Sequence, residues 1–501
     1  MDTELRNRVG VDWLPPAGGG WDALEDPSFG TVFGRVPHSG PEDVDAAVAA
    51  ARKTVDRGHW AATPPWQRAG FLRRIAERLD AIAPELTAAL VRDTGTAARL
   101  CGAVHVLGPV AHLREFAGMH ALLAPVEREP SNPSGTGRWT IRRDPVGVVA
   151  GLLPHSFSVR SAVWKFAPAM LAGNTVVLKA PRLAPLGVHE LARAAEEVGL
   201  PPGVLNVVHG GVDAGRALVG HPDVDFVSFT GSSAAGREVM AAAASGLTPV
   251  LMELGGKTPA VLLDDVDVEW ATRAVMFSSV IGSGQGCVAV TRMLVPASRY
   301  AEVLDVAVRY ARDVVVGPAG EEGTDAGPLI SRAHRRKVEE FIATGVAEGA
   351  RLLAGGGRPD GVPEGGHYLS PALFGDVTPD MTIYQEEIPG PVLVVVPYRD
   401  DDEAIRLAND SRYGLAASVW GADPDRARGV AARLRAGLVW INEAGVMDVA
   451  LAPLAGRGDS GVGAELGPEG LLAYTLPKST WHAGAARRDG GARVESVRES
   501  G

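Results

Sequence analysis

Apolar positions in the N-terminal half of the chain alternate between helical spacing and short unbroken runs. The stretches "PEDVDAAVAAARKTV" and "RAGFLRRIAERLDAIAPELTAALV" repeat apolar side chains at the spacing of one helix face, which predicts amphipathic helices. From residue 139, "WTIRRDPVGVVAGLLP" has the pattern of a strand. It is followed by helix "VRSAVWKFAPAMLAG", strand "TVVLKAP", helix "VHELARAAEEVG", strands "GVLNVV" and "VDFVSFT", and helix "AAGREVMAAAAS". This alternation predicts parallel strands joined by crossover helices.

A second α/β series begins near Glu253 and continues to about residue 450. The stretch "REPSNPSGTG" is rich in turn formers and predicts a loop, whereas the polar, Gly- and Arg-rich residues 484–501 predict a disordered tail. No tandem repeat of fixed period is present in the sequence.

Composition places the chain among globular proteins. Its 501 residues, 46% hydrophobic and 22% charged, can bury a large core and form two or three domains. The formal net charge of -11, without a long basic run before the tail, disfavours nucleic acid or an anionic membrane as a partner. The sequence has two cysteines, no apolar signal core and no apolar run that would span a membrane. We therefore expect a cytoplasmic protein with reduced thiols that acts on small molecules.

Two short motifs suggest chemistry but are ambiguous alone. Cys287 lies among glycines in "GSGQGCVAV", where it is either a core filler or a nucleophile. A strand runs into Gly231, Ser232 and Gly236 in "TGSSAAG", a turn that can present backbone N–H groups to a phosphate but also arises from packing. Lys179 ends the strand "TVVLK", where it can bind a ribose or phosphate or simply face solvent.

Ten motifs in order and register carry a resemblance over roughly residues 25–482. They are "PVGVVAGLLP", "WKFAPAMLAGNTVVLKAP", "GLPPGVLNVV", "HPDVDFVSFTGSSAAG", "LMELGGKTPAVLLDD", "GQGC", "QEEIPGPV", "NDSRYGLAASVW", "GLVWIN" and "SGVGAELGPEGLLAYT". Together they resemble the aldehyde dehydrogenase superfamily.

The resemblance implies an α/β fold in three parts. A Rossmann-type cofactor domain would comprise residues 1–122 and 145–253, and an α/β catalytic domain residues 254–452. Residues 123–144 and 468–483 would form a small antiparallel oligomerisation segment, giving a homodimer or homotetramer.

The resemblance also implies NAD(P)-dependent oxidation of an aldehyde to its carboxylic acid. Cys287 matches the family nucleophile, whose thiohemiacetal passes hydride to the nicotinamide and leaves a thioester for water to hydrolyse. Glu253, in "MELGGK", matches the general base. Glu387 matches the carboxylate that accepts the nicotinamide ribose hydroxyls, and Lys165 matches a lysine lining the site near the proton path. Cys101 matches no motif and is expected in the core.

Several positions depart from the family pattern. "PHSFS" replaces "PWNFP", so Ser156 takes the place of an oxyanion-hole asparagine and His155 that of a tryptophan. Losing such a donor costs about 2.7 to 4 kcal/mol in the transition state unless Ser156 replaces it. Pro389 takes the place of a phenylalanine that lies near the nicotinamide in the family. Leu454, Ala455 and Gly458 replace an aromatic residue, a glycine and a lysine in a further motif.

Cofactor choice depends on Arg182. Many NAD-preferring relatives have Glu at this position, three residues after the lysine, and it binds the adenosine ribose hydroxyls. Arginine cannot accept those hydrogens and suits a 2′-phosphate, which slightly favours NADP over NAD. The alternative is an arginine that points into solvent.

The substrate channel implied by the resemblance includes Phe157, Arg160, Ser161, Trp164 and the loop around Asp448. Arg160 would favour an anionic aldehyde and Asp448 a cationic or hydroxylated one, so the substrate stays open. Histidines 105, 112 and 120 lie too far apart along a helical stretch for a compact metal site, and no metal is expected.

Two hypotheses remain from the sequence. The first is an aldehyde dehydrogenase, favoured by Cys287 and Glu253. The second is a related protein without redox turnover, with a binding, structural or thiol-esterase role, which Ser156 and Pro389 keep open. Transfer of the acyl group to coenzyme A is disfavoured because Glu253 suits hydrolysis.

Overall fold

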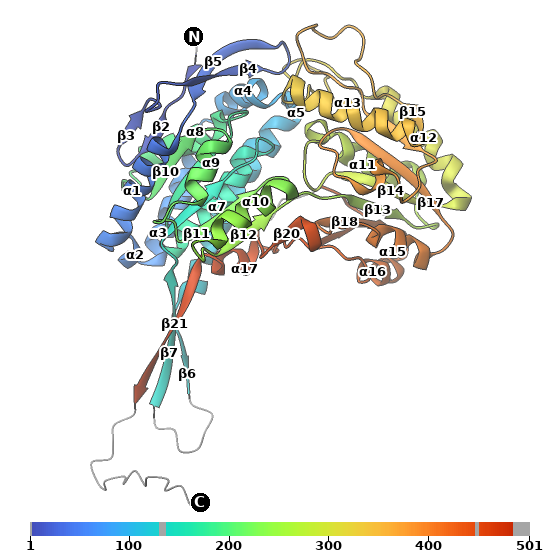
Figure 1. The fold of residues 1–501 in the computed structure, drawn as a ribbon. Helices are drawn as coiled ribbons and strands as arrows, with labels where there is room; N and C mark the ends of the chain where they lie inside the picture. Colours follow the sequence, from blue (N-terminus) through green and yellow to red (C-terminus); the bar gives the residue numbers. More distant parts are fainter. Residues whose placement is uncertain (1–2, 130–136, 446–449, 484–501) are drawn as a thin grey trace, which may run out of the picture.

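Two α/β lobes and a narrow arm of strands make up the protein in the computed structural model (Figure 1). The structure describes residues 3–129, 137–445 and 450–483. Most of the predicted loop at 128–137 and the predicted tail at 484–501 lie outside the described residues. The predicted α/β class is confirmed.

The first lobe is built on a sheet of eight strands whose central members are parallel. Their order is β20 (Gly461–Val462), β12 (Val250–Glu253), β11 (Phe226–Thr230), β8 (Val148–Leu152), β9 (Thr175–Ala180), β10 (Leu205–His209), β2 (Asn7–Val9) and β3 (Asp12–Leu14). In this order, the neighbouring strands from β12 through β11, β8 and β9 to β10 pair in parallel. Strands β20, β2 and β3 pair antiparallel at the two edges of the sheet. The predicted parallel sheet is confirmed.

Helices cover both faces of this sheet. One apolar cluster joins the strands to α1 (Pro41–Arg57), α9 (Val212–Val219) and α10 (Ser233–Ala244). The other joins them to α3 (Pro65–Ala81), α7 (Ser158–Ala172) and α8 (Leu186–Glu197). Because the central strands are buried on both sides, they appear in the sequence as continuous apolar runs.

Two predicted elements are each split in the structure. The helical run at 68–91 forms α3 and α4 (Ala83–Thr94), with non-helical backbone at Ile82 between them. The single strand expected at 139–154 is two strands in different sheets, β7 (Gly137–Pro145) and β8. The chain turns at Gly147, where φ is 129° and a Cβ would lie 2.0 Å from the Asp225 carboxylate. Only glycine fits this turn.

The second lobe has its own sheet of seven strands. Their order is β15 (Arg351–Ala354), β16 (Ala372–Gly375), β17 (Val392–Tyr398), β14 (Val290–Pro296), β13 (Thr258–Leu262), β18 (Ala416–Trp420) and β19 (Leu438–Ile441). Helices α11 (Val268–Val280) and α12 (Tyr300–Asp313) pack on one face. Helices α13 (Arg332–Ala347), α15 (Asp401–Asn409) and α16 (Pro424–Ala431) pack on the other. The predicted second α/β series is confirmed.

The arm is an antiparallel sheet of β6 (Val126–Arg128), β7 and β21 (Thr475–Ala483), which projects from the first lobe in Figure 1. A small N-terminal sheet contains β1 (Thr3–Glu4), β5 (Thr31–Pro37) and β4 (Trp21–Asp26). Besides four short 3-10 helices, the other helices of the described residues are α2 (His59–Ala62), α5 (Ala98–Cys101), the π-helix η1 (Gly102–Leu107), α6 (Gly108–Gly118), α14 (Thr382–Gln385) and α17 (Gly467–Leu472).

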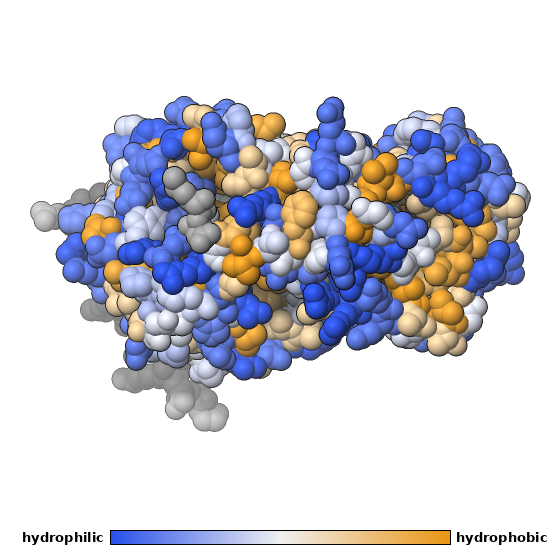
Figure 2. Space-filling view, turned by 90° about the horizontal axis from the view of Figure 1, so that it is seen from above, coloured by the Kyte–Doolittle hydropathy of each residue, from blue (hydrophilic) through white to orange (hydrophobic). Residues whose placement is uncertain are grey.

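Viewed from above, hydrophilic residues cover most of the surface, and apolar residues form separate patches (Figure 2). In the part of the chain that the structure describes, no helix combines the length and apolar character that crossing a membrane requires.

Candidate active site

The carboxyl ends of the central strands of the first sheet open into one cavity of about 1040 Å³. Residues that follow β8, β9, β10, β11 and β12 line it, as expected for ligand sites in open α/β sheets. The cavity brings together most of the predicted site residues, namely Ser156, Phe157, Arg160, Ser161, Trp164, Lys179, Arg182, Gly231, Ser232, Cys287 and Glu387. Glu253 and Gly236 are buried beside it rather than on its wall, and Asp448 lies outside the described residues.

Cys287 reaches the cavity because the chain before it takes left-handed turns. Helix α11 ends at Val280, and Gly282, Ser283 and Gly284 follow with φ of 57°, 57° and 69°. A Cβ on Gly284 would lie 2.4 Å from the backbone of Gly390, so the cysteine loop and the loop that carries Glu387 are in contact. Cys287 itself is partly exposed.

The link between β12 and β13 brings Cys287 and Glu387 to the same turn. A Cβ on Gly255 would lie 2.0 Å from Glu387 Oε2, and one on Gly256 would lie 2.5 Å from the carbonyl oxygen of Cys287. Contacts this short are impossible for a side chain. The glycine pair in "MELGGK" therefore allows the two functional loops to approach each other.

Glu253 ends β12 in a buried group of charges. Lys165, from α7, donates to Glu465 Oε1 at 2.5 Å and to Thr230 Oγ1 at 2.7 Å, with Lys165 and Glu465 fully buried. Among the described residues, neither Glu253 carboxylate oxygen has a hydrogen-bond partner. Burial and the negative charge of Glu465 raise the pKa of Glu253 well above its ordinary value, although Lys165 opposes this. The surroundings of Glu253 therefore favour its protonated form more than water does.

Glu465 was missed as a functional residue by the sequence analysis. It lies within the matched motif "SGVGAELGPEGLLAYT", but nothing in that motif indicates that it meets Lys165, 300 positions away.

The Cys287 thiol is also in its neutral form. Burial, with the charges of Glu387 and Glu253, raises the pKa of the Cys287 thiol to about 12.

The opposite wall of the cavity suits an anionic ligand. Ser232 caps the N-terminus of α10, and its Oγ accepts from the backbone N–H of Ala235 at 3.3 Å. Gly231 and Ser232 line the cavity at this helix end, where N–H groups and the helix dipole favour a phosphate. Gly236 has a packing role, since a Cβ there would lie 2.6 Å from the Leu254 side chain.

Lys179, near the end of β9, and Arg182, just after it, also line the cavity. Burial lowers the pKa of Lys179 to about 8, and its Nζ lies 3.5 Å from the carbonyl oxygen of Gly210. The Arg182 side chain is 54% exposed and lies 3.6 Å from Asp22. Both cations line the cavity, where they can meet a ribose or a phosphate.

Two departures from the family pattern, His155 and Pro389, both contact His334. The rings of His155 and His334 meet edge to face at 5.2 Å, and His334 Nε2 lies 2.6 Å from the carbonyl oxygen of Pro389. Burial lowers the pKa of His155 to about 4, with His334 contributing. His334 and Lys337, both on α13, line the cavity but carry no sequence signal that pointed to the site.

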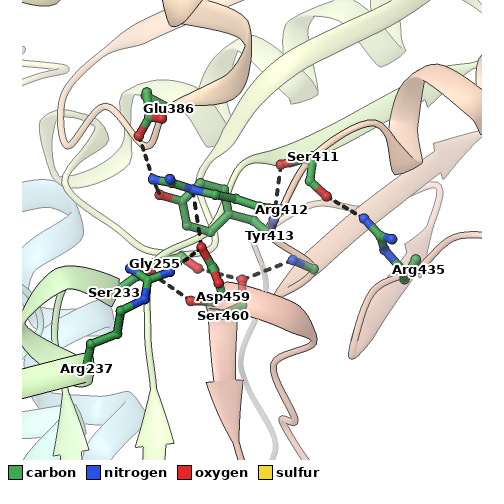
Figure 3. A network of polar contacts seen from close by, with 11 residues as sticks. Ser233, Arg237, Gly255, Glu386, Ser411, Arg412, Tyr413, Arg435, Asp459 and Ser460 are labelled. Atoms are coloured by element: carbon green, nitrogen blue, oxygen red, sulfur yellow. Dashed lines mark hydrogen bonds and ion pairs between the residues drawn. The ribbon is translucent and has the colours of Figure 1, made fainter. Parts of the chain in front are cut away.

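A polar network ties the two lobes together next to Glu387 (Figure 3). Arg412 pairs with Glu386 at 2.6 Å and with Asp459 at 3.4 Å, and Asp459 also pairs with Arg237 of α10 at 2.6 Å. Ser460 Oγ donates to the carbonyl oxygen of Gly255 at 2.6 Å. The network holds the glycine turn and the Glu387 loop in one place.

The three histidines of the helical stretch have separate partners. His105 meets Thr96 at 3.0 Å, His112 accepts from Trp164 Nε1 at 2.8 Å, and His120 lies 3.0 Å from the carbonyl oxygen of Ala117. Within the described ranges, no three His, Cys, Asp or Glu side chains group as metal ligands would. Cys101 is buried, as expected for a core thiol.

Comparison with known proteins gives a consistent result. A sequence profile of the Aldehyde dehydrogenase family matches residues 14–480. Geranial dehydrogenase of Castellaniella defragrans is 40% identical over 477 residues, 95% of this chain and 98% of that protein. Chloroplastic betaine aldehyde dehydrogenase of Beta vulgaris is 39% identical over 469 residues, 92% and 93% of the two chains.

Solved structures agree with the sequence comparisons. The crystal structure of Mycobacterium tuberculosis aldehyde dehydrogenase complexed with NAD+ has a TM-score of 0.92 and 41% identity, covering 96% of this chain and 98% of that one. Betaine aldehyde dehydrogenase of Staphylococcus aureus, in complex with NAD+, has a TM-score of 0.94 and 31% identity, covering 98% and 96%. None of these comparisons supports the alternative of a protein without redox turnover. The chain belongs to the aldehyde dehydrogenase family and is an enzyme that oxidises an aldehyde with a nicotinamide cofactor.

Proposed function

We propose that Cys287 is the nucleophile of this aldehyde oxidation, Glu253 its general base and Ser156 an oxyanion donor. The observation that carries the proposal is the meeting of Cys287 and Glu387 at the glycine turn, on the wall of a cavity whose other side suits a dinucleotide. Glu253 lies two residues before that turn and acts electrostatically on the Cys287 thiol. This arrangement supports a thiol, a base and a cofactor acting at one carbon atom.

The chemistry begins when Glu253, in its carboxylate form, takes the proton of the Cys287 thiol. The sulfur then attacks the aldehyde carbon, a C–S bond forms, and the carbonyl oxygen becomes an oxyanion. The Ser156 hydroxyl and the backbone N–H of Cys287 are the donors we assign to that oxyanion. Loss of the C–H hydrogen with its electron pair would restore the C=O bond and leave a thioester on Cys287, and a bound nicotinamide would supply this oxidation.

Hydrolysis completes the cycle. Glu253 takes a proton from water, the water oxygen attacks the thioester carbon, and the C–S bond breaks to release the acid and the Cys287 thiolate. The buried pair of Lys165 and Glu465 lies beside Glu253 and can exchange that proton. A protonated Glu253 must first lose its proton, which makes this step more favourable at higher pH.

We assign the cofactor to the wall formed by β9, α9 and α10. The N-terminal turn of α10, with Gly231 and Ser232, would hold the pyrophosphate, and Glu387 would accept the nicotinamide ribose hydroxyls. Lys179 and Arg182 would meet the adenosine ribose. Two cations at that ribose suit a 2′-phosphate, so we propose that the enzyme accepts NAD and NADP and slightly favours NADP.

The arm supports assembly. Trp139, Leu476 and Trp481 are 40%, 54% and 40% exposed on β7 and β21, which leaves apolar side chains and strand edges open to pairing. We propose a homodimer or homotetramer joined through the arm, with the domain boundaries predicted from the sequence.

Both Cys101 and Cys287 are free thiols, in keeping with a cytoplasmic location, although some plant relatives are named as chloroplastic or peroxisomal.

Replacing the proposed catalytic groups should abolish oxidation. We expect Cys287→Ala to lower kcat by about 1,000-fold or more, and Glu253→Gln by about 100-fold or more, measured as reduced cofactor at 340 nm. Cys101→Ala is the matched control and should keep wild-type activity, because that thiol is in the core. Activity retained by Cys287→Ala would refute the proposal.

Alkylation of Cys287 should depend steeply on pH. Its raised pKa of about 12 leaves less thiolate at neutral pH than an ordinary cysteine has, and the thiolate fraction grows with each unit of pH. In the cofactor-free enzyme, iodoacetamide labelling should rise about tenfold per pH unit up to about pH 9, without a plateau. Mass spectrometry of the labelled peptide checks this, and a plateau near pH 8.5 would contradict it.

Arg182 should control cofactor choice. We expect Arg182→Glu to lower the NADP to NAD ratio of kcat/KM by about tenfold or more, because a carboxylate repels a 2′-phosphate and accepts ribose hydroxyls. Asp22→Asn, which removes the carboxylate facing Arg182, should shift the ratio toward NADP. If neither variant moves the ratio, Arg182 does not contact the cofactor.

Light scattering at micromolar concentration should give the mass of a dimer or a tetramer. Trp481→Glu, which adds charge to the exposed arm, should weaken that assembly without unfolding the lobes. A wild-type monomer would exclude the proposed assembly.

A further inference from the structure

The turn before Cys287 needs contacts from outside to keep its shape. Gly282, Ser283 and Gly284 lie consecutively in the left-handed region of backbone conformation. Ser283 adopts this conformation at an energetic cost, and a backbone of this kind persists only where the surrounding structure holds it. The position of Cys287 therefore depends on what this turn contacts.

Two side chains of the turn bind one segment of the second lobe. The buried hydroxyl of Ser283 donates to the carbonyl oxygen of Gly327 at 2.8 Å. The Gln285 amide is bound at both ends. Its Oε1 accepts from the backbone N–H of Ile330 at 3.0 Å, and its Nε2 donates to the carbonyl oxygen of Gly282 at 2.9 Å. Gln285 thus binds the turn to this segment and also closes the turn on itself.

The same segment is packed on the first lobe and leads into α13. A Cβ on Gly327 would lie 1.9 Å from the carbonyl oxygen of Gly95, which follows α4. Ser331 caps the N-terminus of α13, where its Oγ accepts from the backbone N–H of His334 at 3.2 Å. The first turn of α13 is therefore fixed relative to the cysteine turn.

From α13, two side chains contact the loop that carries Glu387. His334 Nε2 lies 2.6 Å from the carbonyl oxygen of Pro389, and because a carbonyl oxygen only accepts, this nitrogen donates its hydrogen. A Cβ on Gly390 would lie 2.7 Å from the buried side chain of Val338. These contacts lie two and three residues after Glu387, so they restrict where its carboxylate can lie.

Two departures from the family pattern are joined by His334. The ring of His155 packs edge to face on that of His334 at 5.2 Å, and Pro389 accepts the hydrogen bond of His334. Where the family has a tryptophan and a phenylalanine, this chain therefore has a polar contact through α13.

We propose that residues 327–337 form a frame that sets the nucleophile and the cofactor carboxylate relative to each other. Gln285 is the positioning residue for Cys287 on this frame, and His334 is the positioning residue for Glu387. The inference rests on the proposed function, which assigns those two roles. Such positioning matters because a misplacement of about 1 Å can lower a rate about 100-fold.

His334 should affect cofactor binding through Glu387. We expect His334→Phe, which keeps a ring but loses the N–H donor, to raise the Kd of NAD and of NADP about fivefold or more in calorimetric titrations. His334→Gln, whose amide can still donate to the Pro389 carbonyl, should stay within about twofold of the wild-type Kd.

A double-mutant cycle separates positioning from direct contact with the cofactor. If His334 acts through Glu387, adding His334→Phe to Glu387→Gln should change the Kd by less than about twofold. Losses that add in the double variant would mean that His334 contacts the cofactor itself, and they would overturn the inference. A wild-type Kd in His334→Phe would also overturn it.

Gln285 should affect the cysteine and not the cofactor. Gln285→Met keeps the length of the side chain and removes both hydrogen bonds. Because burial raises the pKa of the Cys287 thiol, release of the turn should speed iodoacetamide labelling of Cys287 at pH 8 about threefold or more. The cofactor Kd should stay within about twofold of wild type, and kcat with hexanal should fall about tenfold or more.

Ser283→Ala is a second, smaller change that should act on labelling in the same direction. Ser279→Ala is the matched control, because its hydroxyl is also buried but donates to Met276 within α11, at 2.7 Å. Labelling of the core thiol Cys101, measured in the same samples by mass spectrometry, should stay at the wild-type level.

The two thiols together give a clear outcome. If Cys101 becomes labelled in step with Cys287, the variant has loosened the whole lobe, and a positioning role for Gln285 is refuted. Unchanged or slower labelling of Cys287 in Gln285→Met would refute it as well.

Separate measurements decide the frame and the proposed roles of Cys287 and Glu387. If Cys287→Ala abolishes oxidation and Glu387→Gln weakens cofactor binding, while Gln285→Met and His334→Phe behave as wild type, only the frame is overturned. If Glu387→Gln binds both cofactors as tightly as wild type, the proposed role of that carboxylate fails and the frame fails with it.

Discussion

The close approach of three loops at one glycine pair is the constraint on which the site depends. Gly255 and Gly256 lie in the link between the last parallel strand of the first sheet and the first strand of the second. Here the Glu387 carboxylate and the Cys287 backbone come nearer than any side chain would allow. The two lobes therefore meet at Cys287 and Glu387, to which we assign the nucleophile and the cofactor carboxylate, and the network of Arg412 and Asp459 lies at the same contact.

Burial sets the resting state of the catalytic groups. Packing around these two side chains raises the pKa of Cys287 and of Glu253, which favours the protonated form of each. Lys165 and Glu465 form the charge pair next to them, with no exposure to solvent.

The two sides of the cavity recognise ligands by different means. The side formed by β9 and α10 offers cations and a helix N-terminus, while the side formed by the π-helix and α7 offers aromatic and aliphatic surface. A π-helix is a rare element that recurs near functional sites, and here it supplies both the apolar wall and the carbonyl that holds Arg160.

The sequence by itself determined the architecture and most of the residues on the cavity wall. The apolar pattern was sufficient to predict the parallel sheets, because strands that are buried on both faces appear in the sequence as continuous apolar runs. The motifs in register pointed to Cys287, Glu387 and the turn before α10. Only the tertiary structure decided which side chains meet across long separations. Glu465 pairs with Lys165, His334 meets Pro389, and Arg160 is held by the π-helix, contacts that no local pattern encodes. It also showed that Glu253 is buried beside the cavity, because burial depends on packing from elements distant in the chain.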